Sequence, residues 1–163
     1  MSRLDSFIRR LSAQRDGLNY VADRVADVPG CVLELGLGNG RTFDHLRTLF
    51  PDRAMFVFER TVAAHPDCIP DSRYLRRGER TEILPGFVAE PPEPIALVHA
   101  DLGSGRPEID GPQAKWLGTL LSTHLVGAYV LSDQSLDGIP GLETVPLPET
   151  IPSGRYYFYR TAC

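Results

Sequence analysis

Lysine, cysteine and long apolar runs are all scarce in this sequence of 163 residues. The longest apolar runs, residues 95–98 and 126–131, fall far below the ~20 residues that a membrane-spanning helix requires. The N-terminal residues include Arg3, Arg9 and Arg10 but no uninterrupted apolar stretch and no small-residue cleavage site, which argues against a secretion signal. We therefore expect a soluble, cytoplasmic protein that does not bind a membrane.

The basic residues are almost all arginine, with Lys115 as the single lysine, and they are scattered along the chain. The formal net charge of -4 gives no overall attraction to a polyanion. Because no local basic patch stands out, nucleic acid is not expected as a partner.

The cysteines number three and are far apart, at Cys31, Cys68 and Cys163, with no CxxC spacing. This pattern argues against both a disulfide framework and a zinc knuckle, and it predicts reduced thiols. With 42% hydrophobic and 23% charged residues, the composition is that of an ordered globular protein. The length predicts one domain over residues 1–163.

Apolar residues recur at helical spacing in an N-terminal segment, residues 1–28, with a possible interruption near Gly17. We expect its apolar stripe to pack onto the α/β core that follows, residues 29–163. Apolar runs bounded by glycine, proline and charged residues predict strands at 31–35, 54–58, 73–76, 95–100, 127–131, 142–147 and 155–160. Helical stripes lie at 42–50 and 113–124, and a short helix is expected to start near Arg80.

Alternating helices and apolar strands are typical of an α/β fold with an open, mostly parallel sheet. We predict a Rossmann-like, doubly wound sheet with helices on both faces and an antiparallel edge formed by the last two strands. Ligands of such sheets bind beyond the carboxyl ends of the strands, near the point where the strand order reverses. The loops after the first, second and fourth strands are therefore the candidate site.

The loop after the first strand, residues 34–42, contains glycine at alternate positions, Gly36, Gly38 and Gly40. Glycine permits positive φ and close approach of a ligand to the backbone. The spacing departs from the dinucleotide pattern GxGxxG, and Glu34 stands two residues before Gly36. A carboxylate at this place disfavours a pyrophosphate and suits a ligand with an amino group. A tight strand-to-helix turn without a ligand is the competing interpretation.

This loop, together with Glu59 at the end of the second strand, resembles the nucleotide loop of class I S-adenosylmethionine-dependent methyltransferases. The phrase Val-Leu-Glu-Leu-Gly-Leu-Gly-Asn-Gly-Arg-Thr is also similar to a small bacterial family of S-adenosylmethionine methyltransferases. The resemblance implies S-adenosylmethionine as cofactor, with Glu34 near its amino group and Glu59 on its ribose hydroxyls. The implied cofactor-binding residues are Glu34, Gly36, Leu37, Gly38, Glu59, Arg60, Glu79, Arg80 and Asp101.

Asp101 follows the fourth strand, where the resemblance places residues that face the methyl group and the acceptor. Asp101 is thus a candidate catalytic residue, and His99 is a weaker one. Asp133 and Gln134 end the fifth strand and, with Asp101, could supply oxygen ligands to a metal, although the resemblance to metal-dependent methyltransferases would require asparagine in place of Gln134. The main expectation is that the site contains no metal.

These features favour an enzyme that transfers a methyl group from S-adenosylmethionine to a small-molecule acceptor. One alternative is a non-catalytic S-adenosylmethionine-binding sensor or subunit, because a short chain has little material for an acceptor lid. A nicotinamide-dependent oxidoreductase is a weaker alternative, since the glycine spacing differs and no tyrosine stands four residues before Lys115. A homo-oligomer is compatible with the sequence.

Overall fold

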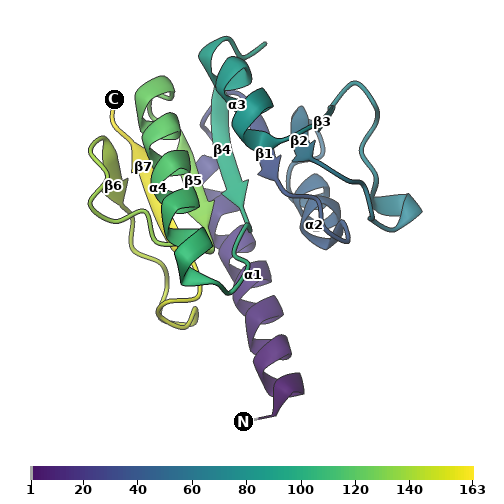
Figure 1. Cartoon of the computed structure of the whole chain (residues 1–163), viewed down its shortest axis with the longest axis vertical. Coiled ribbons are helices and arrows are strands. Elements are labelled where there is room, and N and C mark those ends of the chain that lie inside the picture. The colour runs from purple at the N-terminus through teal and green to yellow at the C-terminus, as the bar shows by residue number, and fades with distance from the viewer. Residues whose placement is uncertain (1) are drawn as a thin grey trace.

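A computed structural model describes residues 2–163, and its elements alternate between helices and strands as the sequence predicts (Figure 1). The helices are α1 (Arg3–Val25), α2 (Arg41–Leu49), the 3-10 turn η1 (Pro66–Cys68), α3 (Arg80–Ala89) and α4 (Pro107–His124). The strands are β1 (Cys31–Leu35), β2 (Met55–Glu59), β3 (Leu75–Arg77), β4 (Ile95–Ala100), β5 (Tyr129–Ser132), β6 (Leu142–Thr144) and β7 (Tyr157–Thr161).

The strands form one seven-stranded sheet in the order β3-β2-β1-β4-β5-β7-β6. Neighbouring strands from β3 to β5 run parallel, whereas β7 is antiparallel to both β5 and β6. The chain moves outward from β1 to β3 and then returns to place β4 beside β1, so the order reverses between β1 and β4. The predicted doubly wound sheet with an antiparallel C-terminal edge is confirmed.

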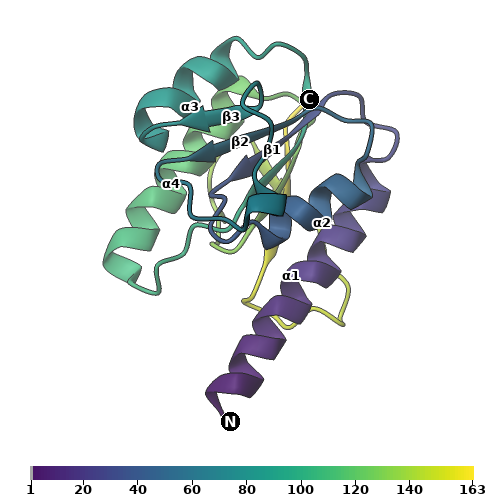
Figure 2. The same ribbon diagram turned by 90° about the vertical axis from the view of Figure 1, so that its right-hand side faces the viewer.

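Two hydrophobic layers cover the sheet, one on each face. Leu84 of α3 and Leu117 of α4 pack against the face that includes Leu33, while Val21 of α1 and Leu46 of α2 pack on the opposite face. Figure 2 shows the sheet edge-on between these two pairs of helices. Every residue of β1 and β4 is buried, because successive side chains alternate between two covered faces.

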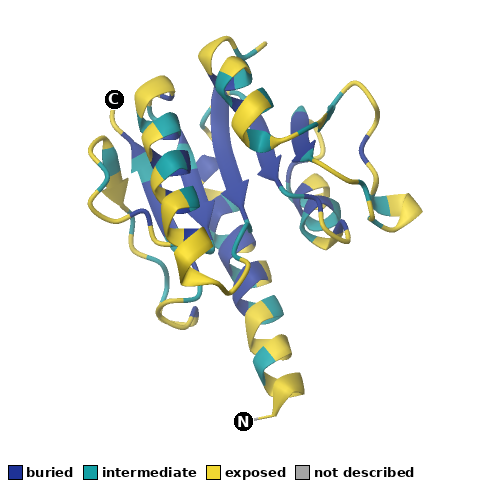
Figure 3. Ribbon diagram, viewed as in Figure 1, coloured by how far each residue is buried: buried dark blue, intermediate teal, exposed yellow. Residues whose placement is uncertain are grey.

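Helix α1 is continuous, so the interruption considered near Gly17 is absent. A capping box at Ser2 and Asp5 satisfies backbone N–H groups at its start. Its C-terminal half packs on the sheet, but its N-terminal half extends beyond the sheet and leaves Leu4, Phe7 and Ile8 exposed by 65%, 45% and 52% (Figures 1 and 3). The expected packing of the apolar stripe therefore holds for half of the helix. No helix in the described part has the length and apolar composition to cross a membrane.

Several boundaries differ from the prediction. Helix α4 begins at Pro107, well before the expected residue 113, because proline is tolerated at the first helical position and Pro112 is accommodated inside the helix. β3, β5 and β7 begin two residues later than predicted, and β6 ends at Thr144 rather than at residue 147. None of these shifts moves a predicted site residue away from the strand ends.

Candidate functional site

The loop between β1 and α2 opens the site because its glycines expose the backbone. Gly36 and Gly38 have positive φ values of 90° and 51°. A Cβ at Gly38 would meet no atom within 4 Å, so the backbone there borders open space. A Cβ at Gly36 would lie 3.2 Å from Leu102 Cδ2. The loop therefore leaves room for a ligand beside its main chain.

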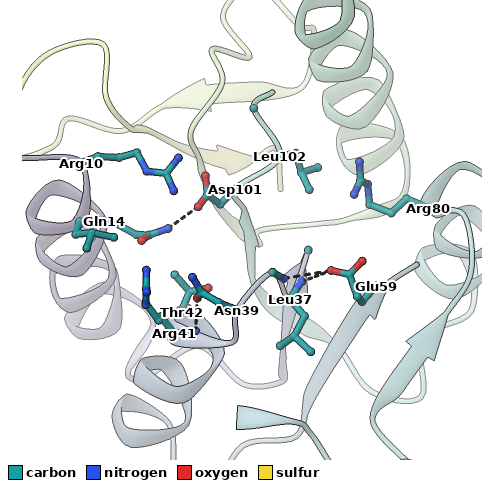
Figure 4. A pocket seen from close by; sticks show the side chains of 14 residues that line it. Arg10, Gln14, Leu37, Asn39, Arg41, Thr42, Glu59, Arg80, Asp101 and Leu102 are labelled. Atoms are coloured by element: carbon teal, nitrogen blue, oxygen red, sulfur yellow. Dashed lines mark hydrogen bonds between the residues drawn. The ribbon is translucent and has the colours of Figure 1, made fainter. Parts of the chain in front are cut away.

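A cavity of about 290 Å³ lies at this loop, near the carboxyl ends of β1, β2 and β4. Its walls come from α1, the glycine loop, the start of α2, the end of β2 and the loop after β4 (Figure 4). The predicted residues that line it are Gly36, Leu37, Gly38, Glu59, Arg80 and Asp101. The volume is close to the lower bound for small-molecule sites, which run from about 300 to 1,000 Å³.

Glu59 ends β2 and directs its carboxylate to the glycine loop. Its Oε2 accepts hydrogen bonds from Leu37 N at 2.9 Å and Gly38 N at 3.2 Å, and its Oε1 accepts one from Thr61 N at 3.1 Å. Partial burial by itself raises the pKa of Glu59, but the backbone N–H donors outweigh it and lower the pKa below its ordinary value. Glu59 is thus an ionised acceptor that also supports the loop.

Arg80, the first residue of α3, lies across the cavity near Glu59 (Figure 4). Burial lowers the pKa of Arg80, and the charges of Glu59 and Glu79 oppose this effect. Arg60 and Glu79 do not line the cavity and instead form an exposed ion pair at 3.1 Å. Direct contact of these two side chains with a ligand in the cavity is therefore not supported by their positions.

Glu34 is completely buried and does not line the cavity. Its Oε2 lies 2.6 Å from His99 Nδ1, and its Oε1 accepts a hydrogen bond from the hydroxyl of Thr42. The predicted contact between Glu34 and the cofactor amino group is corrected, because the carboxylate turns inward and reaches the cavity only through Thr42. A lone buried carboxylate is costly, and a histidine partner makes it tolerable.

His99 is also fully buried, in β4 next to β1. Burial lowers the pKa of His99, but the adjacent Glu34 carboxylate outweighs burial and raises it. Its ring stacks on Tyr156 with centroids 6.2 Å apart, and Nε2 has no hydrogen-bond partner in the described chain. This burial argues against the catalytic contact with an acceptor that the sequence suggested. His99 is instead the partner of the Glu34 carboxylate in the protein interior.

Asp101 faces the cavity from the loop after β4 (Figure 4). Its Oδ2 accepts a hydrogen bond from Gln14 Nε2 at 2.6 Å. Gln14 belongs to α1, and sequence reasoning missed it because 87 residues separate the two side chains. The contact connects the N-terminal helix to the strand end where a catalytic carboxylate was predicted.

Asp133 lies behind this loop. Its two carboxylate oxygens accept hydrogen bonds from Leu102 N at 3.0 Å and Gly103 N at 2.8 Å. Gln134 Nε2 also donates to Asp133 at 3.2 Å. Burial raises the pKa of Asp133, and the negative charge of Asp101 adds to the effect. These hydrogen bonds give Asp133 and Gln134 a role in shaping the loop after β4. Within residues 2–163, no group of three or more His, Cys, Asp or Glu side chains is placed to hold a metal ion.

The sequence of residues 1–161 matches the protein family described as S-adenosyl-L-methionine methyltransferase. The chain belongs to this family. A crystal structure of the S-adenosyl-L-methionine methyl transferase from Silicibacter pomeroyi DSS-3 is 39% identical, with 99% of each chain covered and a TM-score of 0.88. S-adenosylmethionine is accordingly the cofactor, as the resemblance in the glycine loop implied.

Two more distant structures share the fold. Fibrillarin, in its complex with Nop5p, is 14% identical, with 82% of this chain and 72% of that chain covered and a TM-score of 0.53. The aminoglycoside resistance methyltransferase NpmB1 is 13% identical, with 89% and 93% covered and a TM-score of 0.52. At these identities the similarity concerns the fold alone. A search of curated proteins found no match.

The cavity suits the cofactor of this family chemically. The open backbone at Gly38 allows close approach, the ionised Glu59 can accept hydrogen bonds from hydroxyls, and Asp101 provides a negative charge toward the cavity. Of the residues predicted to bind S-adenosylmethionine, those that line this cavity are Gly36, Leu37, Gly38, Glu59, Arg80 and Asp101, and their contact with the cofactor stays a prediction.

Proposed function

We propose that this methyltransferase transfers the methyl group of S-adenosylmethionine to a small-molecule acceptor. The observation that carries the proposal is a single cavity, at the reversal point of the sheet, which contains both the ionised Glu59 and the Asp101 carboxylate. One further observation favours a small-molecule acceptor over nucleic acid: the net charge of -4 gives no overall attraction to a polyanion.

Each end of the cavity has its own task in this proposal. Glu59 accepts hydrogen bonds from the ribose hydroxyls, in place of or beside the loop N–H groups that it now binds, and Arg80 borders the same end. Asp101 faces the reacting end, and Gln14 fixes its orientation through the bond at 2.6 Å. The cofactor supplies an electrophilic methyl group on a sulfonium when it is bound.

The protein contributes mainly alignment and charge to the transfer. The acceptor's lone pair forms the new bond to the methyl carbon while the carbon–sulfur bond breaks and leaves its electron pair on sulfur. An acceptor with an O–H or N–H group also releases a proton, which the Asp101 carboxylate can accept. Asp101 is therefore proposed as the residue that orients the acceptor and takes its proton.

Thermal unfolding with S-adenosylhomocysteine tests the cofactor cavity. A ligand that binds only the folded state stabilises it by RT ln(1 + [L]/Kd), about 2.7 kcal/mol at a hundredfold excess over Kd. We expect a clear rise in Tm with S-adenosylhomocysteine and none with NAD. The opposite result would favour the oxidoreductase alternative.

A matched pair of variants localises the binding. Gly38→Val adds a branched side chain beside the cavity, and Gly105→Val adds the same side chain at a glycine that also has positive φ and no atom within 4 Å of its Cβ, but does not line this cavity. Both should fold with a similar loss of stability, and only Gly38→Val should lose S-adenosylhomocysteine binding. Equal binding by the two variants would contradict the site.

Methyl transfer itself is tested with a panel of small acceptors and labelled S-adenosylmethionine. Wild type should label at least one acceptor, and Asp101→Asn should slow methyl transfer by far more than it weakens binding of S-adenosylhomocysteine. Binding without transfer to any acceptor would instead favour the non-catalytic sensor or subunit.

A further inference from the structure

Two of the three arginines that line the cavity lie at its α1–α2 end. Arg10 comes from α1 and Arg41 from the start of α2. Neither forms an ion pair within residues 2–163, whereas Arg15, Arg47 and Arg60 pair with neighbouring carboxylates. An unpaired cation on the wall of a cavity is available to a ligand with a negative charge.

Arg10 and Arg41 lie on the side of the cavity opposite Glu59. Figure 4 shows Arg10, Gln14 and Arg41 on one side of the cavity, with Glu59 and Arg80 on the other. The two ends thus differ in chemistry. One end offers an acceptor for hydroxyl groups, and the other offers two guanidinium groups beside the Asp101 carboxylate, which Gln14 holds at 2.6 Å.

The helix position of Arg10 and a contact of Arg41 place the two side chains. Arg10 lies one helical turn before Gln14 on α1, so both side chains project from the same face of the helix. The guanidinium carbon of Arg41 lies 6.0 Å from the centre of the Phe7 ring, and its backbone N donates to Asn39 Oδ1 at 3.2 Å. Phe7 is on the exposed half of α1, and the α1 residues that form one wall of the cavity are Arg10, Leu11 and Gln14.

If Glu59 binds the ribose of S-adenosylmethionine, the orientation of the bound cofactor in the cavity follows. The inference therefore rests on the proposed function. The amino-acid end of S-adenosylmethionine then extends toward α1 and α2. That end carries an ammonium group and a carboxylate. The two arginines match the carboxylate in charge.

We propose that Arg10 and Arg41 form a carboxylate subsite that binds the amino-acid end of S-adenosylmethionine. The subsite selects ligands that possess this carboxylate, because a cavity with two unpaired cations gains more from an anion than from a neutral group. It also gives the projecting half of α1 a function in cofactor binding.

Calorimetry with two ligands tests the subsite. S-adenosylhomocysteine contains the carboxylate, and 5′-deoxy-5′-methylthioadenosine retains the adenosine part but lacks the amino-acid part. Arg10→Gln and Arg41→Gln should each weaken binding of S-adenosylhomocysteine about three- to tenfold, as expected for the loss of one charge-assisted contact near the surface. Neither variant should change binding of 5′-deoxy-5′-methylthioadenosine by more than about twofold.

Arg9→Gln is the matched control, since it removes the same charge from the adjacent, exposed position of α1 that does not line the cavity. It should leave both affinities unchanged. Arg41→Lys should recover part of the affinity lost in Arg41→Gln. Added salt should weaken S-adenosylhomocysteine binding by wild type more than by the Arg10→Gln/Arg41→Gln double variant.

The outcomes separate the subsite from the proposed function. If wild type binds neither ligand, the cofactor cavity is wrong. If wild type binds S-adenosylhomocysteine but the arginine variants lose both ligands equally, or neither, then the cavity stands and the carboxylate subsite is overturned.

Discussion

Three acidic side chains at the strand ends perform different tasks, although the sequence suggests the same kind of site for all of them. Glu34 turns inward and pairs with His99, Glu59 braces the glycine loop, and Asp101 faces the cavity. The difference arises from the pleat of the strand and from the partner that each carboxylate meets. At the residue scale, burial and partner decide the role of a carboxylate.

Glu59 should contribute to both binding and stability. We expect Glu59→Gln to weaken S-adenosylhomocysteine binding about ten- to a hundredfold, because a charged acceptor of ribose hydroxyls is lost. The free protein should lose about 1 kcal/mol of stability, since three backbone N–H groups lose their charged acceptor. Calorimetry and urea denaturation measure the two effects.

The pH dependence of stability provides a second measurement on Glu59. Its pKa is lowered in the folded state, so its contribution is present above the ordinary value of 4.5 and disappears as pH falls through the folded pKa. Stability of wild type should therefore fall in acid more steeply than that of Glu59→Gln. If Glu59→Gln bound S-adenosylhomocysteine as tightly as wild type, the assignment of Glu59 to the cofactor site would be wrong.

The Glu34–His99 pair should be far more important for stability than for binding. Glu34→Gln leaves His99 buried without its charged partner and should cost about 3–5 kcal/mol in urea denaturation. The surface variant His124→Gln, on the exposed end of α4, should change stability by less than about 0.5 kcal/mol. A small effect of Glu34→Gln would show that the pair is not needed for the fold.

The same pair predicts a loss of stability in alkaline solution. The pKa of His99 is raised in the folded state, so its contribution is complete below the ordinary value of 6.5 and is lost as pH rises through the folded pKa. Urea denaturation between about pH 6 and pH 10 should show this decline in wild type. In Glu34→Gln the decline should be much weaker, and an equal decline would assign it to another group.

At the scale of elements, α1 has two distinct parts. Leu18, Val21 and Val25 are buried against the sheet, whereas the first turns of the helix are exposed. The exposed Arg10 and the buried Gln14 border the cavity. The helix remains continuous across Gly17, because tertiary packing of its C-terminal half outweighs the low helix propensity of one glycine.

Gly17→Ala should therefore stabilise the protein. The added Cβ would lie 3.5 Å from Leu131 Cδ2, an ordinary contact, and alanine favours the helix by about 0.5–1 kcal/mol. Thermal unfolding should show a higher Tm. Gly118→Ala in α4 is the contrast, since its Cβ would lie 2.3 Å from Ile139 Cδ1 and force that side chain to move. A lower Tm for Gly17→Ala would mean that the α1–sheet contact is tighter than described.

At the scale of the whole molecule, the sheet is most strongly held at its centre. β1 and β4 are buried throughout and lie beside each other, while β3 and β6 form the two edges with mostly exposed or half-buried residues. The cavity lies at the carboxyl ends of these two central strands, so the most stable part of the sheet supports the glycine loop that borders it.

Hydrogen exchange should follow this arrangement. Amides of β1 and β4 should exchange only through global unfolding, and those of β3 and β6 should exchange much faster. Addition of S-adenosylhomocysteine should slow exchange in residues 36–42 more than in the β6 edge. Equal protection of edge and central strands, or no ligand effect on the loop, would contradict the arrangement.

The sequence by itself determined the fold class and the strand-end motifs. Apolar runs that alternate with helical stripes predict a parallel sheet, and the glycines with Glu59 predict a cofactor loop, because these signals lie within short segments. Gly36, Gly38 and Glu59 were found in this way, Arg80 and Asp101 were implied by the family resemblance, and all five line the cavity.

Only the tertiary structure decided the inward turn of Glu34, its pairing with His99 and the entry of Arg10 and Gln14 into the site. These contacts join segments that are distant in the chain, 65 residues apart for Glu34 and His99 and 87 for Gln14 and Asp101. A local pattern shows which residues are polar, but not which face of a strand will be covered or which helix will reach the cavity. Those outcomes depend on how the layers pack, since packing sets both the burial of each side chain and the partners within its reach.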